Sequence, residues 1–217
     1  MFKNFYKIKY NSGVTLVELV VVITIFMIIS GIAIFNYGNL NSSMSLQNLA
    51  DDIALSVRRT QGYAIGVRGS SGIFGDGYGI HFTTNPDISQ LYKGSNKSFV
   101  LFADITPNNK YDYFDYDKCG SPRINNECIE VLNITSTDKI TEIFLDNDAV
   151  AISPTSTVDV LFNRPNPEPV FCYRNNPSDI PCDVRVISFI KIKISSTRDT
   201  QTSRTITISN NGQISVF

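Results

Sequence analysis

Apolar residues follow three different patterns along this 217-residue chain: a continuous run, then a spacing of three and four residues, then short runs that partly alternate with polar residues. From Val14 to Phe35 nearly every position is apolar, apart from glycine, hydroxyl side chains and the single carboxylate of Glu18. A helix over this stretch would be about 33 Å long at roughly 1.5 Å per residue, which is enough to cross the hydrocarbon core of a bilayer. The pattern therefore predicts a membrane-spanning helix near the N-terminus.

In the next segment apolar residues recur at three- and four-residue spacing, which is typical of an amphipathic helix. Glycine and serine residues from Gly66 to Gly72 end this pattern. We therefore expect one long helix from about Val14 to about Val67, whose second half packs on a globular head. The expected buried stripe consists of Leu46, Leu49, Ala50, Ile53, Val57 and Ala64.

After residue 69 the period of the pattern falls to two, and β-branched and aromatic residues dominate the apolar runs. Several runs alternate polar and apolar residues, as 190–194 does, which predicts sheets with one buried and one wet face. Asn210-Asn211-Gly212 predicts a hairpin turn because Asn-Gly tolerates positive φ. The Asn-Pro repeats in 163–169 are interpreted as an extended surface loop. The expected strands are 78–83, 98–103, 130–133, 139–145, 157–162, 186–194, 204–209 and 213–217.

Together these patterns predict an α+β fold, in which a long N-terminal helix packs on an antiparallel β-sheet head.

Glu18 is unusual in the predicted membrane-spanning segment, because an ionised carboxylate in lipid costs on the order of 2.5 kcal/mol or more and is normally paired. The apolar run from Val14 to Phe35 has no Lys or Arg to pair with it. The cation must come from elsewhere, and a free α-amino group is the nearest candidate if the chain is cut between Gly13 and Val14.

The run Gly13-Val14-Thr15-Leu16-Val17-Glu18, followed by an apolar stretch, closely resembles the class III signal of type IV pilins and type II secretion pseudopilins. The resemblance implies that a prepilin peptidase cuts after Gly13 and that the new N-terminus, Val14, is methylated. It also implies that Glu18 pairs with the N-terminal amine of a neighbouring subunit during filament assembly. Val14 departs from the Phe that is usual there. An ordinary signal anchor and a cleavable secretory signal are the competing interpretations.

The leader supports an orientation, because Lys3, Lys7 and Lys9 favour a cytoplasmic N-terminus by the positive-inside rule. The rest of the chain is then outside the cytoplasmic membrane as a single-pass protein. The expected organisation is a leader at 1–13, a transmembrane or filament-core helix at 14–37, an amphipathic half-helix at 38–68 and a β-rich head at 69–217.

Within the pilins, the resemblance is closest to H-type minor pseudopilins and FimT-like minor pilins, and it is carried by 55–65, 101–112 and 204–214. It implies a structural filament subunit rather than an enzyme, whose partners are other pilins, a prepilin peptidase and an inner-membrane assembly platform. The alternative is a membrane-anchored surface binding protein, for example for DNA capture. Some FimT-like pilins use C-terminal arginines for DNA; Arg198 and Arg204 are present, but no arginine follows Gly212.

Composition and charge fit one globular domain beside the anchor, with 42% hydrophobic and 11% aromatic residues and a net charge of −1. Removal of the three leader lysines leaves 16 Lys and Arg against 20 Asp and Glu, a net charge of −4, which disfavours a general nucleic-acid binder. The cysteines form two local pairs, which favours the disulfides Cys119–Cys128 and Cys172–Cys182 in an oxidising compartment. Three connectivities are possible, and the spacing does not fit a zinc site.

Oxygen-bearing side chains gather in the turn of Asp104, Asn108, Asn109 and Asp112, continued by Asp115 and Asp117, as they do in calcium sites, but without EF-hand spacing. We therefore expect no cofactor, with calcium as the only candidate. His81 lies in an alternating strand, where a sheet residue is expected rather than a general base, and no nucleophile motif or phosphate loop is present.

Overall fold

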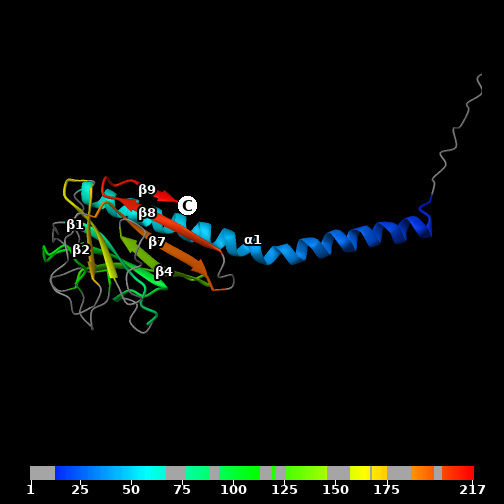
Figure 1. Ribbon diagram of the computed structural model, residues 1–217, viewed down its shortest axis with the longest axis horizontal. Helices are drawn as coiled ribbons and strands as arrows, with labels where there is room; N and C mark the ends of the chain where they lie inside the picture. The colour runs from blue at the N-terminus through cyan, green and yellow to red at the C-terminus, as the bar shows by residue number, and fades with distance from the viewer. Residues whose placement is uncertain are drawn as a thin grey trace, which may run out of the picture. The chain divides into compact units, whose positions relative to one another are not determined.

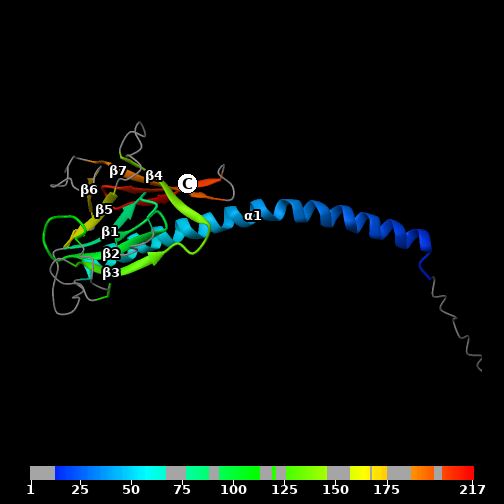
Figure 2. The same ribbon diagram turned by 90° about the horizontal axis from the view of Figure 1, so that it is seen from below.

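The structure is a computed structural model that describes residues 13–66, 77–87, 93–112, 119–120, 126–145, 157–166, 168–174, 187–197 and 202–217. These residues form one long helix, α1 (Leu16–Ile65), and nine strands (Figures 1 and 2). The chain divides into two compact units, Met1–Asn41 and Ser42–Phe217. We call the second unit the head. It contains the C-terminal part of α1 and all the described strands.

The strands form two antiparallel sheets. The five-stranded sheet has the order β3-β2-β1-β5-β6, and the four-stranded sheet has the order β4-β7-β8-β9. The bounds are β1 (Gly77–Thr83), β2 (Ser98–Asp104), β3 (Cys128–Asn133), β4 (Asp138–Leu145), β5 (Thr157–Asn163), β6 (Pro169–Arg174), β7 (Phe189–Ser196), β8 (Ser203–Ser209) and β9 (Ile214–Val216).

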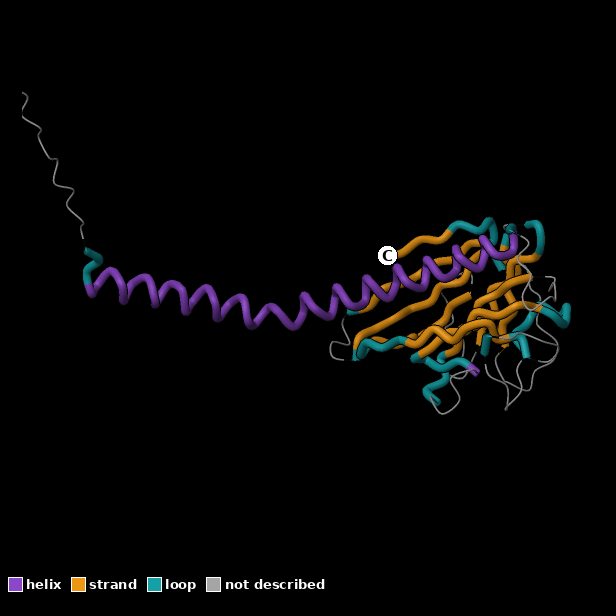
Figure 3. Tube along the Cα trace, turned by 180° about the vertical axis from the view of Figure 1, so that it is seen from behind, coloured by secondary structure: helices purple, strands orange, loops and turns teal. Residues whose placement is uncertain are grey.

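The C-terminal part of α1 lies against the strands of both sheets (Figure 3). The predicted apolar stripe is confirmed, since Leu46, Ala50 and Ile53 are fully buried in one core with side chains from both sheets. Side chains three or four residues apart share one face of a helix, so the stripe presents a continuous apolar surface to the sheets. The apolar contact between α1 and the sheets therefore holds the head together.

The two sheets differ in how their outer faces are covered. In β7 half-buried and buried residues alternate, so the predicted pattern of one wet face is confirmed there. Every residue of β1 and β2 is buried, so the expectation of a wet face is wrong for these strands. Their second face carries a second buried cluster, in which Tyr111 joins the strand residues Val100, Phe102, Cys128 and Leu161.

The end of the helix and the last hairpin lie where the sequence predicted them, whereas one strand was not predicted. The helix ends at Ile65, close to the expected Val67, and Gly212 at φ 80° turns the chain between β8 and β9 as the hairpin signal predicted. β6 (Pro169–Arg174) was missed, because it begins at the last proline of a run that was interpreted as a loop. Pro169 can start this strand because β6 is an edge strand, where a missing N–H is tolerated.

Candidate functional site

The predicted processing site lies immediately before α1. Gly13, Val14 and Thr15 precede the helix and are exposed, and a side chain built on Gly13 would meet no atom within 4 Å. Thr15 caps the helix, because its Oγ1 accepts a hydrogen bond from the Glu18 N–H at 3.3 Å and its carbonyl accepts one from Leu19 at 3.1 Å. The bond between Gly13 and Val14 therefore lies in exposed, non-helical chain, the form in which a peptidase can bind it.

Glu18 lies in the first turn of α1 with its side chain exposed. The helix N-terminus favours a negative charge there, because the first N–H groups of a helix carry partial positive charge. No cationic side chain among the described residues pairs with this carboxylate. A cationic partner for Glu18 must therefore come from outside the described residues.

The first half of α1 exposes its apolar side chains on every side. Leu16–Ile34 has a mean hydropathy of 2.7 and is 0% buried, and it is long and apolar enough to cross a membrane. Apolar surface of this extent is unfavourable in water, so covering it with another apolar surface would be stabilising.

The head contains a disulfide between Cys119 and Cys128, nine residues apart. Cys172 is disulfide-bonded as well. Cys182 lies outside the described residues, so its pairing with Cys172 stays a prediction.

The turn that suggested calcium is held together by its own hydrogen bonds. Asn108 Nδ2 donates to Asp112 Oδ2 at 2.7 Å, and Lys110 Nζ lies 3.3 Å from Asp112 Oδ1. The described residues contain no group of three or more His, Cys, Asp or Glu side chains placed to hold a metal, and Asp115 and Asp117 lie outside them. Calcium binding stays a prediction, and an ion here would have to displace the Lys110 ammonium.

Glu127, which the sequence did not single out, lies immediately before β3 and hydrogen-bonds to the backbone of this turn. Its Oε1 accepts hydrogen bonds from the backbone N–H groups of Ile105 and Thr106 at 2.9 Å each, and its Oε2 accepts one from Asp112 at 3.0 Å. Burial raises the pKa of Glu127 to about 8, and the neighbouring Asp104 carboxylate adds to the rise while the backbone donors oppose it. The role of this residue is structural, since its side chain is fully buried.

His81 pairs with Asp159 on the adjacent strand β5. Its Nδ1 lies 2.5 Å from Asp159 Oδ1, and Asp159 Oδ2 accepts a hydrogen bond from the Tyr111 N–H at 3.2 Å. The two side chains are only 1% and 0% exposed. A general base must reach its substrate, so this geometry supports the interpretation of His81 as a sheet residue.

Arg204, one of the two arginines considered for DNA, contacts α1. Its Nε donates to Gln47 Oε1 and its Nη2 to Ser43 Oγ, both at 3.3 Å. Its guanidinium is therefore engaged between β8 and the helix instead of being presented to a ligand. Arg198 lies outside the described residues.

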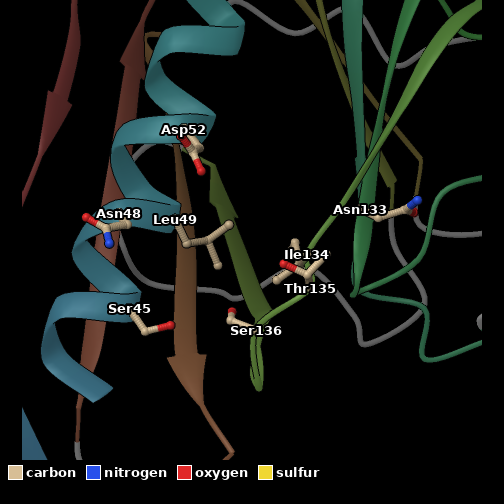
Figure 4. A pocket seen from close by; sticks show the side chains of 8 residues that line it. All are labelled: Ser45, Asn48, Leu49, Asp52, Asn133, Ile134, Thr135 and Ser136. Atoms are coloured by element: carbon tan, nitrogen blue, oxygen red, sulfur yellow. The ribbon is translucent and has the colours of Figure 1, made fainter. Parts of the chain in front are cut away.

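A polar groove of about 240 Å³ lies between α1 and the connection from β3 to β4 (Figure 4). Its floor is apolar, since Leu49 and Ile134 are only 7% and 8% exposed. Its rim carries hydrogen-bonding side chains from both elements. The lining residues are Ser45, Asn48, Leu49, Asp52, Asn133, Ile134, Thr135 and Ser136.

The wall of the groove is fixed by Asp138, which is fully buried at the start of β4. Ser45 Oγ from α1 and Ser136 Oγ both donate to Asp138 Oδ2, at 2.5 and 2.7 Å. Lys97 Nζ donates to the backbone carbonyls of Asp138 and Ser136, at 2.6 and 2.8 Å. Burial lowers the pKa of Lys97, and the Asp138 carboxylate opposes that shift. The sequence offered no signal for this cluster beyond a serine two residues before an aspartate.

Comparison with known proteins identifies the N-terminal segment. Residues 8–34 match the family profile described as the prokaryotic N-terminal methylation motif, which confirms the predicted resemblance to the type IV pilin signal. The match covers Gly13, Val14 and Glu18 and most of the apolar half of α1. No curated protein matches the sequence.

Two solved structures resemble the chain, both of the type IV minor pilin FimU of Pseudomonas aeruginosa. One is 14% identical with a TM-score of 0.41, and the likeness covers 84% of this chain and 92% of that chain. The other is 13% identical with a TM-score of 0.39, covering 79% and 92%. A likeness at this level carries no conclusion about partners or activity.

Proposed function

We propose that this chain is a minor pilin or pseudopilin, a structural subunit of a type IV pilus-like or type II secretion filament. A prepilin peptidase of the cytoplasmic membrane removes residues 1–13, and the amine of Val14 is then methylated. The chain spans the cytoplasmic membrane once before assembly, with its head outside. Its partners are the first-half helices of other subunits, brought together by an inner-membrane assembly platform.

The observation that carries this proposal is the coincidence of the methylation motif with an uncovered helix. The motif at residues 8–34 overlies the segment Leu16–Ile34, which is 0% buried. Lipid covers such a helix before assembly, and close packing among neighbouring helices covers it afterwards.

In this mechanism Glu18 fixes the axial register between the helices of neighbouring subunits. Its carboxylate has no cation within the described chain, and an unpaired charge in an apolar environment is strongly unfavourable. The α-amine of Val14 on a neighbouring subunit supplies the missing charge. The pair forms only when the two helices have the correct axial offset, so it selects one arrangement of subunits.

The proposal is tested by replacing Glu18 with Ala and with Gln in the native host. Both variants should keep a folded head, because Glu18 does not belong to the head, and both should be lost from sheared filaments while they accumulate in the membrane. Thr24→Ala is the matched control. Within the part of the chain that the structure describes, the Thr24 hydroxyl bonds only the Val20 carbonyl, at 2.8 Å, so this variant should assemble normally. Normal incorporation of both Glu18 variants would count against the mechanism and favour a monomeric, membrane-tethered surface protein.

A further inference from the structure

We propose that the groove between α1 and the β3–β4 connection receives a lysine or arginine side chain from a neighbouring filament subunit, with Asp52 as its counter-charge. This rests on the proposed function, since it needs neighbouring subunits. It adds a second electrostatic contact, on the head, to the one that Glu18 makes at the start of α1.

The one charged side chain that lines the groove is the carboxylate of Asp52, while the Lys97 ammonium behind the wall is bound to the carbonyls of Ser136 and Asp138. Asp52 is exposed on α1 and lines the groove, and none of the eight lining residues is Lys, Arg or His. Within the described chain no cation lies within 4 Å of its carboxylate. A basic side chain is the simplest complement to such a site, because opposite charges are matched across specific interfaces.

The two serine hydroxyls of the groove wall are arranged as acceptors. The hydroxyl protons of Ser45 and Ser136 are committed to the buried Asp138 carboxylate, so the groove wall presents oxygen lone pairs instead of donors. The rim also carries Asn48 and Asn133, whose side-chain amides can both donate and accept hydrogen bonds. Lysine and arginine side chains carry only donors, so they match this wall better than a carboxylate or a neutral hydroxyl would.

The size and floor of the groove fit a side chain. About 240 Å³ accommodates one long side chain but not a folded segment. Leu49 and Ile134 provide an apolar floor on which the methylene stem of Lys or Arg can lie while its charged end reaches Asp52. The wall is held by the hydrogen bonds from Ser45 and Ser136 to a fully buried carboxylate, so little order has to be gained on binding.

The decisive variant is Asp52→Lys, with Asp51→Lys as its matched control. Asp51 is the adjacent exposed carboxylate on α1, but it accepts from Gln47 Nε2 at 3.2 Å and does not line the groove. Expressed as full-length proteins in the native host, Asp52→Lys should fall about tenfold in the sheared filament fraction, because it places like charges together. Asp51→Lys should change by less than about twofold, as is typical of an exposed charge outside a contact. Equal behaviour of the two variants would overturn the proposal.

A photo-crosslinking residue at Thr135, on the opposite rim, identifies the occupant. In assembled filaments it should crosslink to a neighbouring subunit at a peptide that contains Lys or Arg, and Asp52→Lys should abolish that product. Asp52→Asn, which keeps the side-chain shape, should weaken it, and limited proteolysis of each variant checks that the head is folded. A crosslink to a peptide without a basic residue, or none in filaments that contain the chain, would contradict the assignment.

These outcomes distinguish a failure of the groove proposal from a failure of the proposed filament function. If the wild-type chain enters filaments through Glu18 but Asp52→Lys enters equally well, only the role of the groove is wrong. If the wild-type chain never enters filaments, the proposed function is wrong, and the contact is wrong with it.

Discussion

The head and the first half of α1 differ in where their side chains find partners. In the head, Ile53 is fully buried by the sheets, and the Glu127 carboxylate accepts three backbone hydrogen bonds from its own chain. In the first half of the same helix, Ile25 is 52% exposed, and Glu18 has no cationic partner among the described residues. Side chains of the same kind are thus satisfied internally in one region and left for external partners in the other.

This contrast explains how one helix can serve two purposes. Residues from Leu46 onward keep their apolar side chains on one face, and the chain itself covers that face. Residues 16–34 are apolar all round, which no single sheet could cover. The change of pattern along α1 therefore separates the part that folds from the part that we propose assembles.

The largest effect on stability is expected from shortening one isoleucine side chain in each half of α1 and comparing the two variants. Ile53→Ala should lower the free energy of unfolding of the head by about 2–5 kcal/mol, because it leaves a cavity in the core. Ile25→Ala should leave that free energy unchanged, because Ile25 is 52% exposed and is not one of the buried core residues. Urea denaturation of both full-length variants in the same detergent measures the difference, and equal losses would contradict the division.

A smaller effect is expected from the pH dependence of Glu127. Its folded pKa of about 8 exceeds the ordinary 4.5, so the folded chain binds this proton more tightly than the unfolded chain. Its contribution to stability is therefore full below about pH 4.5 and is lost as the pH rises through about 8. Glu127→Gln should remove this part of the decline, whereas Glu142→Gln, at a half-exposed carboxylate, should retain it. Denaturation curves across this range provide the measurement, and an unchanged slope in Glu127→Gln would show that the residue does not titrate there.

The smallest effect is expected from the polar contact between α1 and β3. Arg59 forms an ion pair with Glu130 and lies over the Tyr63 ring at 5.6 Å, but both partners of the pair are more than a third exposed. Arg59→Ala should cost less than about 1 kcal/mol, because exposed ion pairs contribute little. The neighbouring exposed Arg58→Ala should cost nothing measurable. A loss comparable to that of Ile53→Ala would mean that charge, and not apolar burial, holds the helix to the head.

The features that could be predicted from the sequence are those set by local period and spacing. The apolar half of α1 follows from an unbroken apolar run, and the processing motif follows from contiguous residues. The buried stripe of α1 and eight of the nine described strands follow from periods near 3.6 and 2. The features that were missed depend on distant residues. Ser45 and Asp138 are 93 residues apart, and Ile105 and Thr106, whose N–H groups bond to Glu127, precede it by 22 and 21 residues. No periodicity encodes such contacts, so the groove and the buried carboxylates became visible only in the structure.

The central claim is that the first half of α1 is completed by another subunit after the chain is cut at Gly13. The most direct test is the intact mass of the native protein, purified from membranes and from sheared filaments. We expect a chain that begins at methylated Val14 in both fractions, and Gly13→Ala should retain the leader. A native chain that still begins at Met1 would leave the amine thirteen residues away from its proposed position and would contradict the account.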